Sequence, residues 1–337
     1  MLRIVIIDPT NSRFYEINNR TIRTVWETTI DLAPSSLSFT VIKGEQLPRL
    51  EGFEVKAYFE GKQFFSGYIT DRSKTQTGDL SVVAQDQSFY LKTEVVKKVI
   101  NHTASTIFES ICKEFNIKYA TLTQAEKKIE NRIADGETLW EIMNKAINET
   151  ATLETRLYII RDVVGVLTFY AIDTLLPNQV NVKYPILGEG SRVIGFNYNS
   201  SIAEDTYNRV VVVYKDSKKN KREVYNEFDN STESSVKKWG ILQKVASVDF
   251  ELTPAKAQEI AKRILQAKNR ATTSFSITAF GDINVKAGDV VILNFPELFE
   301  VEKLKNLGYY IVKSCSHTFG SSHEMNIEVL LYYTVGE

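Results

Sequence analysis

Few residues in this chain have side chains suited to catalysis or metal binding. Three histidines occur among its 337 residues. His102 precedes a predicted helix cap, whereas His317 and His323 flank the turn of a predicted hairpin near the C-terminus. A metal held by His317 and His323 would need a third ligand, and no convincing candidate is visible. The histidines therefore predict neither a metal site nor a cofactor site.

The two cysteines show no pattern typical of redox or metal chemistry. Cys112 and Cys315 form neither a CxxC pair nor any other ligand spacing. Cys315 alternates with polar neighbours in a predicted strand, as a packing residue does. This cysteine usage indicates a reduced protein made in the cytoplasm.

The acidic residues have simple structural interpretations. Asp135 is expected to cap a helix that begins shortly after it, with Glu137 and Glu141 on the polar face of that helix. Asp86 follows a strand and precedes a turn, which suggests an Asx-type turn. Nothing in the sequence selects an opposed pair of carboxylates of the kind that a glycosidase needs.

No P-loop, nucleophile elbow, HExxH motif or dinucleotide fingerprint is present. No catalytic residue is predicted, and a structural or assembly protein is favoured over an enzyme.

One charged segment stands apart from the rest of the chain. The run KDSKKNKREVY, residues 215–225, reads first as an exposed hairpin tip. The alternative is a docking surface for an acidic protein partner, with these candidate contacts: Lys218, Lys219, Lys221 and Arg222. Acidic residues follow the run, and the net charge of the chain is −1, so a nucleic-acid-binding role is not expected.

The composition favours β structure. The chain contains 18 Phe and 16 Tyr, and 43% of its residues are hydrophobic. No window reaches the roughly 18 apolar residues that a membrane span requires. The start, MLRIVIIDP, reads as a first strand and not as a signal peptide.

Strand patterns fill residues 1–92, with a tight hairpin turn predicted at Glu60-Gly61. Residues 101–175 contain two amphipathic helices, the first capped by Thr103, followed by a hairpin around residues 163–165. A third helix begins after Thr253, with Pro254 at its first position and an ion pair between Glu259 and Arg263.

A sequence echo links the two ends of the chain. Residues 38–59 align without a gap to residues 274–295, and the identical pairs are Ser38/Ser274, Phe39/Phe275, Gly52/Gly288, Val55/Val291 and Phe59/Phe295. Later segments agree in order, with Gly67-Tyr68-Ile69 in one and Gly308-Tyr309-Tyr310-Ile311 in the other. The echo predicts two similar β-barrels, with Phe39 and Phe275 on equivalent strands.

The predicted fold class is α+β, mainly β, with two similar antiparallel β-barrels. A small α+β module lies between them, and the second barrel carries a helix-containing insertion. The predicted boundaries are 1–95 for the first barrel, 96–180 for the module, 181–215 with 272–337 for the second barrel, and 216–271 for the inserted hairpin and helix.

Several segments, in this order, resemble the baseplate hub proteins of contractile phage tails and prophage-like tailocins. They are FSGYITD, GDLSVVAQDQSFYLK, TASTIFESICKEFNI, ADGETLWEIMNKAI, YNRVVVVY, VKAGDVVILNFPEL and GYYIVKSCSH. The resemblance covers nearly the whole chain.

The resemblance implies a homotrimer in which six similar barrels from three chains form a ring. Such a ring is a symmetry adaptor between a six-fold tail tube and a three-fold central spike. The implied partners are the tube protein, the spike protein and a LysM-type or other baseplate adaptor. The chain ends directly after the second barrel, so spike and wall-cutting activities are expected on separate chains, which disfavours the type VI secretion relatives.

Two alternatives remain open at this point. One is a tail-associated cell-wall hydrolase with its site in residues 101–175, and the other is a carbohydrate-binding module. Phage and bacteriocin particles are not distinguished by the sequence.

Overall fold

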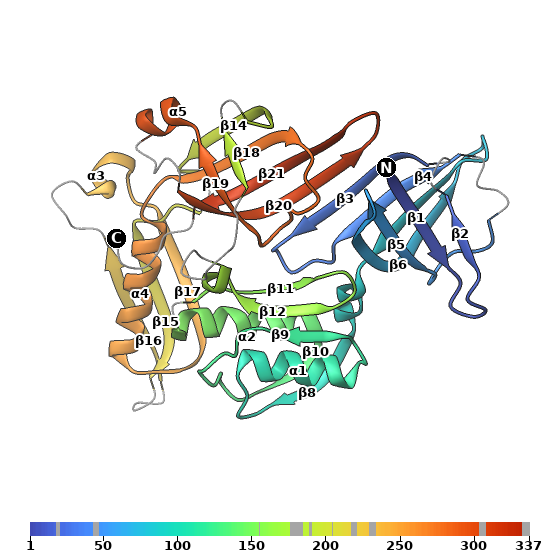
Figure 1. Ribbon diagram of the computed structural model, residues 1–337. Helices are drawn as coiled ribbons and strands as arrows, with labels where there is room; N and C mark the ends of the chain where they lie inside the picture. The colour runs from blue at the N-terminus through green and yellow to red at the C-terminus, as the bar shows by residue number, and fades with distance from the viewer. Residues whose placement is uncertain are drawn as a thin grey trace. The chain divides into compact units, whose positions relative to one another are not determined.

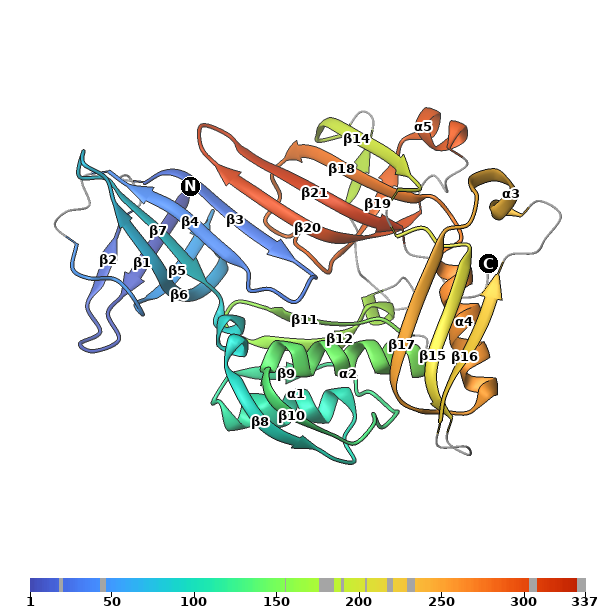
Figure 2. The ribbon, with the colours of Figure 1, turned by 180° about the vertical axis from the view of Figure 1, so that it is seen from behind.

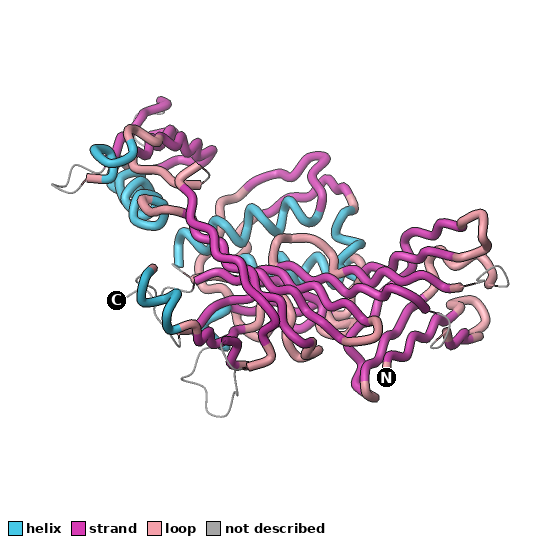
Figure 3. The backbone as a smooth tube through the Cα atoms, turned by 90° about the horizontal axis from the view of Figure 1, so that it is seen from above, coloured by secondary structure: helices cyan, strands magenta, loops and turns pink. Residues whose placement is uncertain are grey.

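The computed structural model describes residues 1–17, 21–42, 47–154, 156–175, 185–188, 191–203, 205–216, 221–228, 234–302 and 308–331. The chain divides into a larger unit, Met1–Asn197 with Ser276–Glu337, and a smaller unit, Tyr198–Phe275. Strands predominate over helices (Figure 3), as the aromatic-rich composition predicts. None of the helices in the described segments is long and apolar enough to cross a membrane.

The first β domain contains seven antiparallel strands. They are β1 (Leu2–Ile7), β2 (Phe14–Glu16), β3 (Thr21–Thr29), β4 (Ser36–Val41), β5 (Glu54–Phe59), β6 (Lys62–Lys74) and β7 (Leu80–Gln85), paired in the order β3-β4-β7-β6-β5-β1-β2. Glu60 and Gly61 join β5 to β6, both with positive φ (51° and 83°), which confirms the tight two-residue turn. Alternating apolar residues face one core, which includes Leu37, Phe39 and Val55.

The α+β module follows a short 3₁₀ helix, Gln87–Lys92. Its elements are β8 (Glu94–Val99), α1 (Ala104–Glu114), β9 (Tyr119–Thr121), β10 (Arg132–Thr138), α2 (Leu139–Glu154), β11 (Tyr158–Asp162), β12 (Leu167–Ala171) and a short 3₁₀ helix (Ile172–Leu175). β8 pairs with β10, and β12 lies between β11 and β9. Both predicted helices and the hairpin are confirmed. Thr103 caps α1 by accepting from the amide of Thr106.

The predicted cap of α2 at Asp135 is wrong. Asp135 lies within β10, opposite Val96, at a bulge that separates it from Glu137. The strand continues to Thr138, which caps the helix with Glu141: the Glu141 amide donates to Thr138 Oγ1 (3.2 Å), and the Thr138 amide donates to Glu141 Oε2 (2.7 Å). Glu137 also lies on β10 and not on the helix, and its carboxylate pairs with Lys145.

We therefore expect Thr138→Ala to lower the free energy of unfolding by about 1 kcal/mol, because it removes the acceptor at the helix start. Asp135→Ala, at an exposed strand position, should change it by less than about 0.5 kcal/mol. Urea unfolding of both variants measures the difference. Equal losses would contradict the assignment of the cap to Thr138.

The second β domain contains β13 (Ile186–Gly188), β14 (Val193–Ser201), β18 (Thr272–Phe280), β19 (Val290–Asn294), the short helix α5 (Pro296–Val301), β20 (Tyr309–Phe319) and β21 (His323–Leu331). Its strands follow the order β14-β18-β21-β20, with β19 beside β20 and β13 beside β19. This is the order β3-β4-β7-β6-β5-β1 of the first domain. Phe39 on β4 and Phe275 on β18 thus occupy equivalent strands, which confirms the predicted duplication.

Backbone hydrogen bonds at the two echoed glycines repeat as well. Gly52 N donates to Ile69 O (2.8 Å), and Gly288 N donates to Val312 O (2.8 Å). The return bonds run from Ile69 N to Phe53 O (2.9 Å) and from Val312 N to Asp289 O (2.8 Å). Ile69 therefore corresponds to Val312.

Two features of the repeat differ from a simple copy. Val55 pairs with Gly67 and Val291 pairs with Tyr310, so the Gly67 and Gly308 segments are offset by two residues from the match that the sequence suggests. β1 runs antiparallel to β5, whereas β13 runs parallel to β19.

The paired glycines supply a matched stability test. Gly52 and Gly288 have φ of 83° and 82°, where a side chain costs about 1–2 kcal/mol. A Cβ on Gly52 would meet nothing within 4 Å, but one on Gly288 would lie 2.5 Å from the Tyr170 hydroxyl. We expect Gly288→Ala to cost about 1–2 kcal/mol more than Gly52→Ala in chemical unfolding, since Tyr170 must move. Equal costs would contradict this packing.

The strand pairings of the described residues form an open path and not two closed barrels. One sheet runs through both domains because β20, beyond its bulge, pairs with β3 of the first domain instead of closing its own. The predicted mainly β fold with two similar domains is thus confirmed, with a joint sheet in place of closed barrels.

The smaller unit has its own core. It contains β15 (Arg209–Asp216), β16 (Lys221–Phe228), α3 (Ser235–Trp239), β17 (Gln243–Leu252) and α4 (Pro254–Lys268). β15 lies between β16 and β17, and α4 packs its alanines Ala257 and Ala261 with Val210 and Val212. Thr253, Pro254 and the Glu259–Arg263 ion pair (2.7 Å) start and brace α4 as predicted. The expectation that residues 209–215 belong to the second barrel is wrong, because their partners are β16 and β17.

Candidate assembly interface

The two β domains meet along a strand seam. β3 pairs antiparallel with β20 through six residue pairs, from Thr29 opposite Ser314 to Thr24 opposite Phe319 (Figures 1 and 2). We call this the β3–β20 seam. Thr28 reinforces it, because its Oγ1 donates to the carbonyl of Cys315 (3.3 Å).

Aromatic rings from both domains cover one face of the seam. Trp26 on β3 stacks on His317 of β20, with ring centroids 4.9 Å apart. Phe319 and His323 stack at 4.4 Å, and Phe59 of the first domain contacts both rings. Such ring pairs add about 0.5–1.5 kcal/mol each beyond simple burial. Beside them lies a pocket of about 550 Å³ lined by Met1, Leu2, the start of β3, Phe59 and residues 319–323.

The two histidines of this cluster form one hydrogen-bond chain. His317 Nε2 lies 2.7 Å from the carbonyl of Val285, and His317 Nδ1 lies 3.0 Å from His323 Nε2. A carbonyl can only accept, so His317 donates through Nε2 and accepts at Nδ1 from His323. Burial lowers the pKa of His317 to about 4 and also lowers the pKa of His323. The pair is therefore neutral and structural at physiological pH.

Cys315 also belongs to the seam. Its Sγ lies 3.2 Å from His317 Nε2 and 3.5 Å from the carbonyl of Val285. Burial raises the pKa of the Cys315 thiol well above its ordinary value, which disfavours the nucleophilic thiolate. In the described part of the chain, no three His, Cys, Asp or Glu side chains are placed to hold a metal ion.

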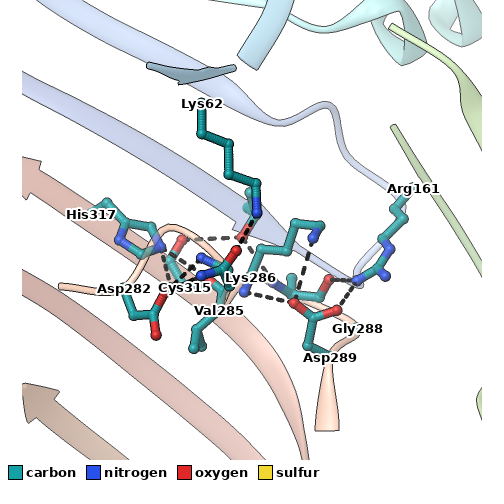
Figure 4. A network of polar contacts seen from close by, with 12 residues as sticks. Lys62, Arg161, Asp282, Val285, Lys286, Gly288, Asp289, Cys315 and His317 are labelled. Carbon is teal, nitrogen blue, oxygen red and sulfur yellow. Dashed lines mark hydrogen bonds and ion pairs between the residues drawn. The ribbon is translucent and has the colours of Figure 1, made fainter. Parts of the chain in front are cut away.

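The loop of residues 281–289 joins three parts of the larger unit (Figure 4). The Arg161 guanidinium of the module donates to Asp289 Oδ1 (2.6 Å) and to the carbonyl of Ala287 (2.9 Å). Tyr170 donates to the carbonyl of Gly288 (3.1 Å). From the first β domain, Thr28 Oγ1 accepts from the Ala287 amide (2.9 Å), and Lys62 donates to Asn284 Oδ1.

Electrostatics favour this arrangement. Burial alone would lower the pKa of Arg161, but the attraction of Asp289 outweighs it, and the pKa lies above its ordinary value. Burial lowers the pKa of Lys286, which lies 3.6 Å from Asp289. One carboxylate thus compensates two partly buried cations. Removing it would leave both cations without their carboxylate, whereas removing Arg161 would leave Asp289 with Lys286.

Two carboxyl groups, the buried Asp86 and the half-buried Asp162, lie where the chain passes between the first β domain and the module. Asp86 accepts from the amides of Ser35 and Ser88 (both 2.9 Å), which confirms the predicted turn. Asp162 accepts from Gly165 N (2.7 Å) and from Gln87 Nε2 (3.0 Å). Burial raises the pKa of both groups, and the nearby Asp86 helps raise that of Asp162 to about 7. Three backbone amides and the side-chain amide of Gln87 donate to these oxygens, so the two carboxyl groups hold the loops around them in place.

The predicted partner contacts fall outside this interface. Lys221 and Arg222 begin β16 of the smaller unit, where both are exposed and Arg222 lies opposite Lys215. Lys218 and Lys219 lie outside the described residues. Sequence reasoning missed Arg161 and Tyr170, whose partners lie 128 and 118 residues away. Residue spacing gives no indication of contacts between residues so far apart in the sequence. Only Gly288, the partner of Tyr170, was recognised in advance, as part of the sequence repeat.

Sequence comparisons match most of the chain to one family. A family model described as YQBQ-like matches residues 24–330. The Bacillus subtilis (strain 168) protein named "Uncharacterized protein YqbQ" is 27% identical over 285 residues, covering 83% of this chain and 81% of that protein.

Two solved structures share the architecture along nearly their whole length. The 43 kDa tail protein of prophage MuSo2 from Shewanella oneidensis has a TM-score of 0.72 and 14% identity, with 98% of both chains covered. A tail protein from Neisseria meningitidis MC58 has a TM-score of 0.71 and 12% identity, covering 97% of this chain and 96% of that one. The fold is that of prophage tail proteins, and the chain belongs to the YQBQ-like family.

Proposed function

We propose that this chain is the structural baseplate hub of a phage or phage-like contractile tail. Three copies would form a symmetry adaptor between a six-fold tail tube and a three-fold central spike. The duplicated β domain carries the proposal: three chains with two equivalent domains each present six similar docking units. The likeness of the whole chain to prophage tail proteins supports the setting.

The contacts inside the larger unit are those expected of a rigid structural protein. The β3–β20 seam, the aromatic cluster and the 281–289 loop tie both β domains and the module together. Arg161, Tyr170 and His317 each make hydrogen bonds in these contacts, which is consistent with a structural role. We propose that the protein has no enzymatic activity of its own and acts within the tail particle after synthesis in the bacterial cytoplasm.

The proposal also names the partners of the hub and one candidate docking surface. The tube protein, the spike protein and a LysM-type or other baseplate adaptor are the proposed partners. The exposed Lys221 and Arg222, with Lys218 and Lys219, are candidate contacts for an acidic face of one of them.

The test is assembly. The purified chain is measured by native mass spectrometry alone and after mixing with tube and spike proteins from the same particle. Three copies of the 38.3 kDa chain, about 115 kDa, are expected alone or within the mixed complex. A chain that stays monomeric and ignores both partners would overturn the proposal.

A second assay separates the hub from the alternatives. The pure protein is incubated with purified peptidoglycan, and both released fragments and bound protein are measured. Neither turnover nor saturable glycan binding is expected. Turnover that a single acidic substitution abolishes would instead indicate a wall hydrolase.

A further inference from the structure

The β3–β20 seam is a contact between two equivalent domains. The first β domain contributes β3, the strand at one end of its strand order. The second β domain contributes the second half of β20. The first half of β20 pairs with β19, and after the bulge between Val312 and Ser314 the strand pairs with β3. Each domain should therefore possess both kinds of edge, and among the described residues only one of each is paired with the other domain.

The unused counterpart of β20 is the second half of β6. Its first half pairs with β5, and its bulge between Ile69 and Asp71 matches that of β20. Residues 71–74 correspond to 314–317, and we call them the β6 edge. Within the described residues their strand partner is β7 alone. Ser73 and Lys74 are exposed, whereas His317, the equivalent of Lys74, is buried and lies opposite Trp26 of β3.

The unused counterpart of β3 is β14. It is the terminal strand of the path and pairs with β18. Residues 193–197, which we call the β14 edge, carry two large apolar side chains toward solvent: Ile194 is 53% exposed and Phe196 is 48% exposed. An apolar strand at the end of a sheet promotes association with another strand unless something covers it.

One hydrogen bond on the β6 edge is consistent with a strand edge that pairs only with a matched partner. The amide of Arg72 donates to the carboxylate of Asp71, its own neighbour, at 2.8 Å. Cys315, the equivalent of Arg72 in the second domain, lies opposite Thr28 in the β3–β20 seam. A carboxylate that accepts from a strand amide discourages indiscriminate pairing but can rotate away when a matched strand arrives.

We propose that the β14 edge of one copy pairs antiparallel with the β6 edge of the next copy. This contact would repeat between chains the β3–β20 seam that exists within each chain. It is head-to-tail, since the two edges differ, and such a contact closes into a ring when the rotation allows it. The inference rests on the proposed hub, and it names the surface through which the copies associate.

Cysteine cross-linking tests the pairing. Ser73→Cys is combined in turn with Val193→Cys, Ile194→Cys and Gly195→Cys, which samples the register between the strands. Both native cysteines are buried, so background oxidation is low. At least one double variant should give covalent dimers and trimers on a non-reducing gel, because facing strand residues fall within disulfide reach. Each single variant, and Ser73→Cys with Val224→Cys, should remain uncross-linked.

A charge placed on the edge gives an independent measurement. Ile194→Lys should abolish the species of about 115 kDa under conditions in which the wild-type chain assembles. Val224→Lys is the matched control, since Val224 is an exposed strand residue of the smaller unit (57% exposed), and it should assemble normally.

The outcomes separate the two proposals. A wild-type chain that never assembles overturns the hub and this inference together. A trimer that Ile194→Lys leaves intact, with no double variant cross-linked, overturns the strand pairing alone. Cross-linking by a single-cysteine variant would show like edges meeting and would also overturn it.

Discussion

Replacing Arg161 with alanine is expected to lower the free energy of unfolding of the larger unit by about 2–3 kcal/mol, because Asp289 loses its charged hydrogen bond in a partly buried site and keeps Lys286 as its one neighbouring cation among the described residues. The side chains of Arg161 and Asp289 are only 17% and 19% exposed. The carbonyl of Ala287 would lose its donor as well. Urea unfolding followed by tryptophan fluorescence measures the loss, since Trp26 and Trp140 both lie in this unit.

A matched control comes from an exposed pair in the same unit. Arg3 pairs with Glu16, with side chains 53% and 39% exposed. Arg3→Ala should cost less than about 1 kcal/mol, since water replaces the lost contact. The double variant Arg161→Ala with Asp289→Asn should cost more than Arg161→Ala alone, because it also leaves Lys286 without the carboxylate that it pairs with. An Arg161→Ala loss no larger than that of Arg3→Ala would contradict the role of the 281–289 loop as a junction.

Local signals in the sequence predicted the local structure well. Glu60-Gly61 specified its turn because both positions adopt positive φ, and Thr103 and Thr253 specified helix starts because their side chains satisfy free amides. Asp135 looked equally suitable as a cap. The sequence did not reveal that β8 lies beside β10 and extends that strand to Thr138.

The repeat was visible for a physical reason. Gly52 and Gly288 hold the same left-handed backbone and exchange the same hydrogen bonds, so substitution is restricted at both positions. What the repeat could not show is which strand pairs with which across domains. The run of residues 209–216 has strong strand propensity, yet propensity does not choose a partner, and β15 pairs within the smaller unit.

The interface itself was the least predictable part. His317, His323 and Cys315 were recognised in the sequence only as isolated residues around a hairpin. Their structural role depends on pairing with β3, which places Trp26 against His317 although the two residues are nearly 300 positions apart in the sequence. Contacts of this kind depend on the complete fold, so no local pattern encodes them.

His317 also gives the seam a pH dependence whose sign can be worked out. Burial holds its folded-state pKa near 4, whereas in the unfolded chain the ordinary value is 6.5. Between these values the unfolded state binds a proton that the folded state does not, so acid favours unfolding. Through His317, the free energy of unfolding is highest above pH 6.5 and falls by about 3 kcal/mol as the pH drops from 6.5 to 4.

Neighbouring charges modify this trend in known directions. The proximity of His323 and Lys286 lowers the pKa of His317 further, while the carboxylate of Asp282 and the hydrogen bond to Val285 raise it. Asp162 acts in the opposite sense on stability, because its raised pKa makes the folded state take up a proton as the pH falls below about 7. The pH profile of the wild-type protein alone therefore mixes opposing contributions.

The difference between the wild type and His317→Gln isolates the histidine. At pH 7.5 the variant should be less stable, since it loses the stacking on Trp26 and the link to His323. At pH 4 that deficit should shrink by about 3 kcal/mol, because glutamine has no proton to bind in the unfolded state. Phe64→Leu, which disturbs Trp26 and Phe319 without titrating, should show the same cost at both pH values. A His317→Gln deficit that is equally independent of pH would contradict a neutral, buried His317, and would reopen its role in the seam.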